Sequence, residues 1–190
     1  MKRIAENLSR FPSRAIYSDT YPLDDFYAAR GKELPFIVPH KPDFVPAPYN
    51  SLLVHQTDMT STLEKFHGEP LHVELLARHM QDNEYYREVV LVLDHSKKRV
   101  EFGAIKINLN LFPAEAQAEI LQEQQPLGRV LNHFNIPFNS RPTAFFSVNS
   151  DEFISTALQV DYESVLYGRR NTLLDSWERP LAEIIEILPR

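Results

Sequence analysis

Two apolar runs near the C-terminal end of the sequence constrain the fold more than any other feature. They cover about residues 165–174 and 180–188, and the polar group D-S-W-E at 175–178 separates them. Asp and Ser at a break between apolar runs are typical of tight turns. The two runs are therefore predicted to form two antiparallel strands.

The second of these strands carries carboxylates within its apolar run. Because side chains alternate along a strand, Glu186 lies on the face of Ile184 and Leu188, and Glu183 lies on the opposite face. A carboxylate in apolar surroundings is costly to ionise unless it is paired. Glu186 is therefore either an outward-facing residue or a functional acid, because alternation alone does not say which face is buried.

The rest of the chain predicts more strands, with helices gathered between them. S-T-L-E at 61–64 has the pattern of a helix capping box, and Gly68 is a typical helix stop. An α+β fold is expected, with a single antiparallel sheet and helices packed on it. Strands are expected at about 71–77, 86–93, 99–109 and 143–148, a hairpin at 94–98, and helices at about 23–30, 61–67, 113–124 and 126–131.

The first part of the chain differs in composition from the remainder. Five of the 14 prolines lie between residues 35 and 48, and this spacing disfavours both a helix and a central strand. Apolar residues between the prolines indicate that the segment lies along the body. We expect an N-terminal extension over 1–48, either an ordered wrap or a lid, and one domain over 49–190.

Composition excludes several classes of function. The chain of 190 residues has no cysteine, a net charge of −6 and no apolar run of 18 residues. These features exclude thiol chemistry and predict no membrane span, no nucleic acid partner and a cytoplasmic location. No phosphate-binding glycine loop, G-x-S-x-G or H-E-x-x-H occurs, and the seven histidines are poorly spaced for a metal. No metal or cofactor is therefore expected.

Arg87 stands at the start of the apolar strand Y-R-E-V-V-L-V-L. Alternation places it with Val89, Leu91 and Leu93. An arginine on a buried face needs an anion, and its planar fork suits a carboxylate. The alternative is a strand-end arginine that reaches solvent or pairs with a glutamate. Arg169 and Arg170 are adjacent, so at most one of them is expected to face inward.

Five motifs in order resemble the chorismate lyase family, the enzymes that release pyruvate from chorismate to give 4-hydroxybenzoate. The resemblance covers residues 52–189, and each motif is weak alone. The motifs are L-L-V-H-Q-T-D-M-T-S-T-L-E at 52–64, Y-R-E-V-V-L at 86–91, P-L-G-R-V-L at 126–131, Y-G-R-R-N-T-L at 167–173 and E-I-L-P at 186–189.

The resemblance implies a buried ligand pocket and roles for particular residues. In the family a strand arginine and the P-L-G backbone hold the product's carboxylate, which corresponds here to Arg87, Leu127 and Gly128. A glutamate on the last strand, here Glu186, would act as general acid or base at the ring. Met59 would line the pocket. The sequence has I-K at 105–106 where the enzymes of ubiquinone biosynthesis tend to have an arginine, so Lys106 or one of Arg169 and Arg170 would supply the second cation.

The expected activity is thus a cofactor-independent carbon–oxygen lyase that acts on chorismate, with 4-hydroxybenzoate or another isomer as the aromatic product. The alternative is a non-catalytic domain of the same fold that binds a small aromatic or carboxylated ligand, as the effector domains of one class of bacterial transcription regulators do. No helix-turn-helix is evident in residues 1–48, which disfavours a regulator.

Overall fold

One curved, eight-stranded sheet organises the protein. The computed structural model describes residues 5–8, 11 and 18–190. The strand order is β1-β3-β4-β5-β8-β7-β6-β2. The strands are β1 (Glu6–Asn7), β2 (Ile37–His40), β3 (Leu71–Gln81), β4 (Glu84–Leu93), β5 (Arg99–Asn108), β6 (Asn139–Asn149), β7 (Val165–Leu174) and β8 (Pro180–Leu188).

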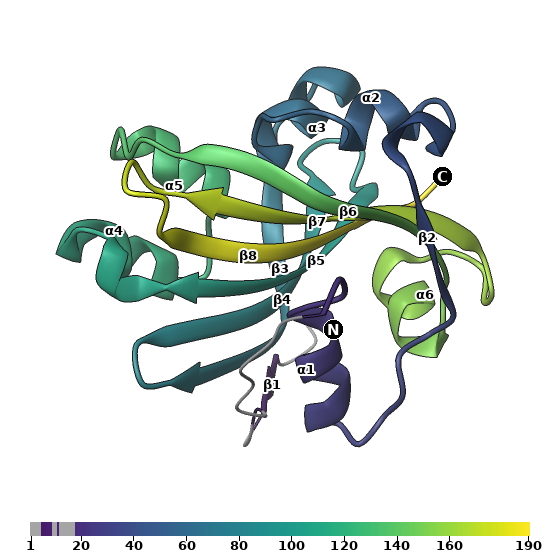
Figure 1. Cartoon of the computed structure of the whole chain (residues 1–190), viewed down its shortest axis with the longest axis horizontal. Coiled ribbons are helices and arrows are strands. Elements are labelled where there is room, and N and C mark those ends of the chain that lie inside the picture. The colour runs from purple at the N-terminus through teal and green to yellow at the C-terminus, as the bar shows by residue number, and fades with distance from the viewer. Residues whose placement is uncertain (1–4, 9–10, 12–17) are drawn as a thin grey trace.

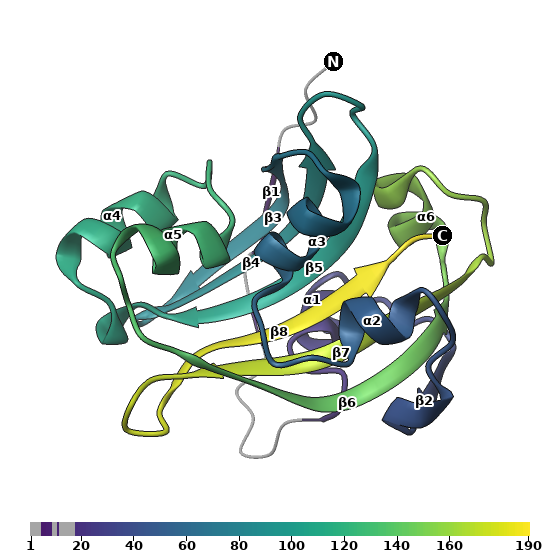
Figure 2. The ribbon, with the colours of Figure 1, turned by 90° about the horizontal axis from the view of Figure 1, so that it is seen from above.

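Helices cover both faces of this sheet (Figures 1 and 2). On one face, α2–α5 pack over the first apolar cluster, and on the other, α1 and α6 pack over the second. The α-helices are α1 (Leu23–Ala29), α2 (Tyr49–Leu53), α3 (Met59–His67), α4 (Ala114–Leu121), α5 (Leu127–His133) and α6 (Glu152–Leu158), and short 3₁₀ turns lie at Pro42–Phe44 and Leu109–Leu111.

The fold class expected from the sequence is confirmed as α+β, with one difference in the sheet. Neighbouring strands pair antiparallel except at one edge, where β1 pairs with β3 in parallel, so the sheet is mixed. The C-terminal hairpin of β7 and β8 has the predicted boundaries. The helix α6 was not predicted. It begins at Asp151, whose side chain accepts a hydrogen bond from the Ile154 N–H.

The start of α3 differs from the prediction of a capping box at residue 61. Asp58 is the N-cap, and its Oδ1 accepts a hydrogen bond of 2.8 Å from the Ser61 N–H. Its carboxylate satisfies a backbone donor that the first turn leaves free. Gly68 ends the helix with φ +70°, as predicted, because the left-handed conformation is open to glycine.

The proline-rich segment adds an edge strand to the sheet. β2 contains Pro39 and pairs with β6 on one side only, the position that a strand with a missing N–H donor tolerates. Val45 is buried, but Phe36 is 69% exposed and Phe44 is 72% exposed. The segment therefore touches the body through some of its apolar residues. Its division from residues 49–190 as a separate extension stays a prediction.

Alternation along the central strands holds as predicted, and both faces turn out to be buried. Val89, Leu91 and Leu93 of β4 belong to the cluster under α2–α5, whereas Val90 and Val92 belong to the cluster under α1 and α6. A strand in the middle of a sheet that is covered on both sides has no polar face. Every ionisable side chain on these strands therefore needs a partner or a function.

Candidate functional site

A small cavity lies between the sheet and the N-terminal ends of α3 and α5. Its volume is about 40 Å³. One cation, three carboxyl groups and several apolar side chains share its walls. The lining residues are Asp58, Met59, Thr60, Val73, Arg87, Val89, Leu91, Glu101, Ile105, Pro126, Leu127, Gly128, Asn171, Leu173, Ile184 and Glu186.

The cavity brings together five of the residues that the sequence singled out and leaves out two. The five are Arg87, Glu186, Leu127, Gly128 and Met59. Lys106 and Arg170 lie on the opposite face of the sheet, because each is one residue out of phase with the side chains that line the cavity. There the Lys106 Nζ is 2.6 Å from a Glu84 oxygen, and the Arg170 Nη2 is 3.2 Å from a Glu183 oxygen. Neither can supply the second cation expected in the pocket.

Arg87 is fully buried on β4, at 0% exposure. Its Nη2 donates a long hydrogen bond of 3.3 Å to the Gln125 carbonyl oxygen. Among residues 5–8, 11 and 18–190, its Nε and Nη1 have no hydrogen-bond partner. Burial lowers the pKa of Arg87, and the acidic groups of Tyr85 and Glu123 act against this effect. A guanidinium in this state is well placed to receive an anion.

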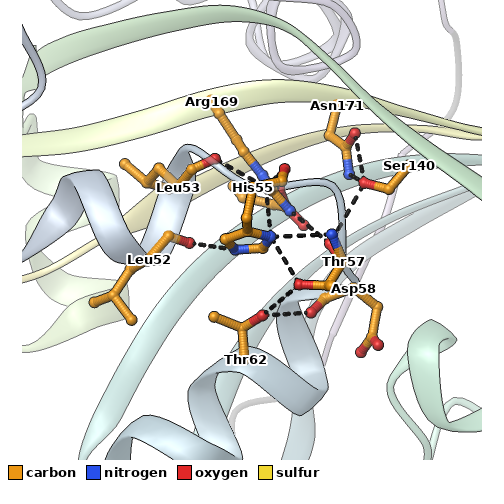
Figure 3. A network of polar contacts seen from close by, with 10 residues as sticks. Leu52, Leu53, His55, Thr57, Asp58, Thr62, Ser140, Arg169 and Asn171 are labelled. Carbon is orange, nitrogen blue, oxygen red and sulfur yellow. Dashed lines mark hydrogen bonds and ion pairs between the residues drawn. The ribbon is translucent and has the colours of Figure 1, made fainter. Parts of the chain in front are cut away.

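The inward-facing arginine of the G-R-R pair is Arg169, and the protein itself satisfies it. Its Nε donates to the Glu186 carboxylate directly across from it on β8. Its Nη1 donates to the carbonyl oxygens of Leu53 at 2.9 Å and His55 at 3.1 Å (Figure 3). Arg169 therefore ties the connection between α2 and α3 to the sheet. Glu186, for which the resemblance implied a role as general acid or base, is the buried partner in this ion pair.

The connection between α2 and α3 is held by a polar network around His55 (Figure 3). His55 Nε2 lies 2.7 Å from the Leu52 carbonyl oxygen and donates to it, so Nδ1 accepts from the Thr57 N–H at 3.1 Å. Burial, followed by the charge of Arg169, lowers the pKa of His55. A neutral imidazole fits both hydrogen bonds. The network fixes the loop that leads into Asp58, Met59 and the cavity.

Gly128 allows α5 to approach the start of α3 closely. A Cβ atom at this position would lie 2.6 Å from Asp58 Oδ1 and 2.9 Å from Thr60 Oγ1. Both contacts are far inside van der Waals distance, so any other residue would displace the Asp58 and Thr60 side chains, including the cap of α3. The P-L-G motif is thus a packing requirement, and it places Leu127 and Gly128 in the cavity wall.

Glu101 is the residue that sequence reasoning missed. It lies on β5, is 3% exposed, and its Oε2 has no hydrogen-bond partner among the described residues. Burial raises the pKa of Glu101 well above its usual value, and the nearby charges of Glu186 and Asp58 add to this rise. Strand alternation could have indicated it, because Glu101 lies on the same face of β5 as Ile105, which lines the cavity.

Two other features are absent from the part of the chain that the structure describes. No group of three or more His, Asp and Glu side chains there could hold a metal ion. No helix over those residues is both long enough and apolar enough to cross a membrane.

Comparison with known proteins relates the chain by fold alone. No family model matches the sequence, and no curated protein matches it. Among solved structures, PhnF from Mycobacterium smegmatis has a TM-score of 0.56 at 15% identity, over 72% of this chain and 65% of that chain. The effector domain of PhnF has a TM-score of 0.55 at 16% identity, over 70% and 88%. This chain therefore spans about two thirds of PhnF, at 65%.

A weaker match is the ligand-binding domain of a putative GntR-family transcriptional regulator from Bordetella bronchiseptica. Its TM-score is 0.45 at 13% identity, over 56% of this chain and 67% of that chain. The expectation of an enzyme is wrong, because the solved structures that share the fold are PhnF and its effector domain rather than a lyase. The comparisons show a chorismate lyase-like α+β fold, which is also the fold of regulator effector domains.

Proposed function

We propose that this protein is a non-enzymatic domain that binds a small molecule with an acidic group in the cavity under α3 and α5. The observation that carries the proposal is Arg87, a fully buried guanidinium with two nitrogen atoms that no described residue satisfies. Buried polar groups in proteins are nearly always hydrogen-bonded, and exceptions call for an explanation. Carboxylate or phosphate oxygens would accept charge-assisted hydrogen bonds from such nitrogens.

The other cation in the region supports the same assignment by contrast. Arg169 is equally buried, yet it pairs with Glu186 and with backbone carbonyl oxygens. The protein can therefore satisfy an inward-facing arginine of its own fold. Two nitrogens of Arg87 have no such partner among the described residues, as expected for a residue whose partner is a ligand.

The size of the cavity sets a condition on binding. Its volume of about 40 Å³ is smaller than the ~150 Å³ cavity in which benzene binds. A ligand of more than a few heavy atoms therefore requires the walls to move apart. The mobile part of the wall would be the start of α3 and α5, since the other wall is the central sheet. Binding is expected to be slower than diffusion for this reason.

The test is a binding screen by calorimetry with small carboxylates and phosphate monoesters. We expect at least one compound to bind to the wild-type protein and to lose binding in Arg87→Met. The bound compound should be recovered chemically unchanged. The matched control is Arg78→Met, which removes the same charge. Arg78 is the strand neighbour of Arg87, but its side chain is exposed and pairs with Glu123. Equal binding to both variants would refute Arg87 as the anchor.

A further inference from the structure

Glu101 is a second buried group in the cavity whose hydrogen bonding the protein leaves incomplete. Its Oε2 has no partner in the described part of the chain, and the nearest cation is already engaged. Arg169 lowers the pKa of Glu101 through its charge, but its N–H groups go to Glu186 and to carbonyl oxygens. The protein therefore buries a carboxyl group beside two other acidic residues, Glu186 and Asp58, without a hydrogen bond to Oε2.

The sheet register separates the backbone positions of Arg87 and Glu101 along the cavity wall. On the paired strands β4 and β5, Arg87 is level with Ile105, and Glu101 is level with Leu91. Four residues along a strand correspond to about 13 Å between backbone positions. Arg87 and Glu101 face the same side of the sheet, so a cation and a carboxyl group line one cavity.

The absence of a side chain at Gly103 makes room for the Glu101 carboxyl. Gly103 lies on the same face as Glu101 and Ile105, and a Cβ atom there would lie 3.2 Å from Val89 Cγ2 and 3.3 Å from Glu101 Oε1. The Glu101 side chain therefore extends along β5 over Gly103, toward the level of Arg87.

We infer that the ligand is amphoteric, with an acidic group bound by Arg87 and a hydrogen-bond donor, an amine or a hydroxyl group, bound by Glu101 in the same cavity. This inference rests on the proposed function, because it assigns the second end of the same ligand. It adds a requirement that an anion site alone does not impose. An acid without a donor at its far end leaves the Glu101 carboxyl unsatisfied.

The two kinds of donor differ in what happens to the Glu101 proton. Burial raises the pKa of Glu101, which favours the protonated carboxyl in the free protein. An ammonium group would favour the ionised carboxylate, so binding would release one proton to the buffer. A hydroxyl group would donate to the neutral carboxyl without any change in protonation.

The experiment uses matched sets of ligands on the whole chain. Each set contains a parent acid and its terminal amino and hydroxy derivatives: propionate with β-alanine and 3-hydroxypropionate, butyrate with 4-aminobutyrate and 4-hydroxybutyrate, and benzoate with 4-aminobenzoate and 4-hydroxybenzoate. If the screen favours phosphates, the sets are built on phosphate monoesters. Calorimetry in two buffers of different ionisation enthalpy measures affinity and proton release together.

We expect a derivative to bind at least about tenfold more tightly than its parent, and Glu101→Leu to remove this preference without weakening the parent. Glu101→Gln keeps the size and polarity of the side chain and serves if the leucine variant fails to fold. It should lose the preference for an amine and retain part of a preference for a hydroxyl. Thermal unfolding of each variant checks that the fold is intact.

Two other outcomes separate this inference from the proposed function. If parent acids bind as well as their derivatives and Arg87→Met abolishes both, the anion site stands and the inference about Glu101 is wrong. If no acid binds to the wild-type protein, the proposed function fails, and the inference fails with it.

Discussion

Replacing Arg87 with methionine should stabilise the protein while it abolishes ligand binding. Two buried guanidinium nitrogens lack partners among the described residues, and an unsatisfied buried donor costs about 1–3 kcal/mol. The substitution removes these costs and loses one long hydrogen bond to the Gln125 carbonyl oxygen, worth about 1.5–3 kcal/mol at most. Methionine has a similar length, so it fills most of the space. We expect a net gain of about 1–3 kcal/mol in the free energy of unfolding.

The matched variant is Arg169→Met, on the same face of the same sheet. It removes the partner of Glu186 and leaves a buried carboxylate unpaired, which costs about 3–5 kcal/mol. Urea unfolding followed by far-UV circular dichroism measures both variants against the wild-type protein. A loss of more than about 1 kcal/mol in Arg87→Met, or equal effects of the two substitutions, would refute the reasoning that Arg87 is the unsatisfied arginine.

Three further predictions concern other parts of the fold. Burial raises the pKa of Glu88 to about 7 despite its ion pair with Arg30, so the folded state favours the protonated carboxyl. The stability that Glu88 contributes is therefore present below about pH 4.5 and is lost as the pH rises to about 7. The unfolding free energy of the wild type relative to Glu88→Gln should fall by about 3 kcal/mol over that range in urea titrations, and a constant difference would contradict the raised pKa. Gly128→Ala should destabilise by about 1–3 kcal/mol in thermal unfolding, because its Cβ would displace the Asp58 cap; an unchanged melting temperature would argue against the close approach. Lys106→Met should leave calorimetric ligand affinity unchanged, since Lys106 lies across the sheet from the cavity; a loss of binding would refute that placement.

Much of the local structure follows from the sequence. Turn residues between apolar runs predicted the boundaries of β7 and β8, and Gly68 predicted the end of α3, because these signals act over a few residues. Strand alternation also grouped Arg87 with Val89 and Leu91 correctly. The start of α3 was misplaced because both Asp58 and Ser61 are good caps, and only the packing against α5 distinguishes them.

The functional site depends on pairings that sequence alone does not contain. Alternation separates the two faces of a strand, but helices cover both faces here, so it could not tell that Lys106 and Arg170 lie away from the cavity. Only the register of β7 against β8 brings Arg169 opposite Glu186 and satisfies both. The register of β4 against β5 places Arg87 and Glu101 in one cavity without partners for all their polar atoms.

The sequence by itself determined the α+β class, most elements and the candidate arginine, since these depend on local backbone preference and periodicity. The tertiary structure decided which charges are paired and which are left over. That difference is physical, because the cost of a buried charge depends on partners far away in the chain.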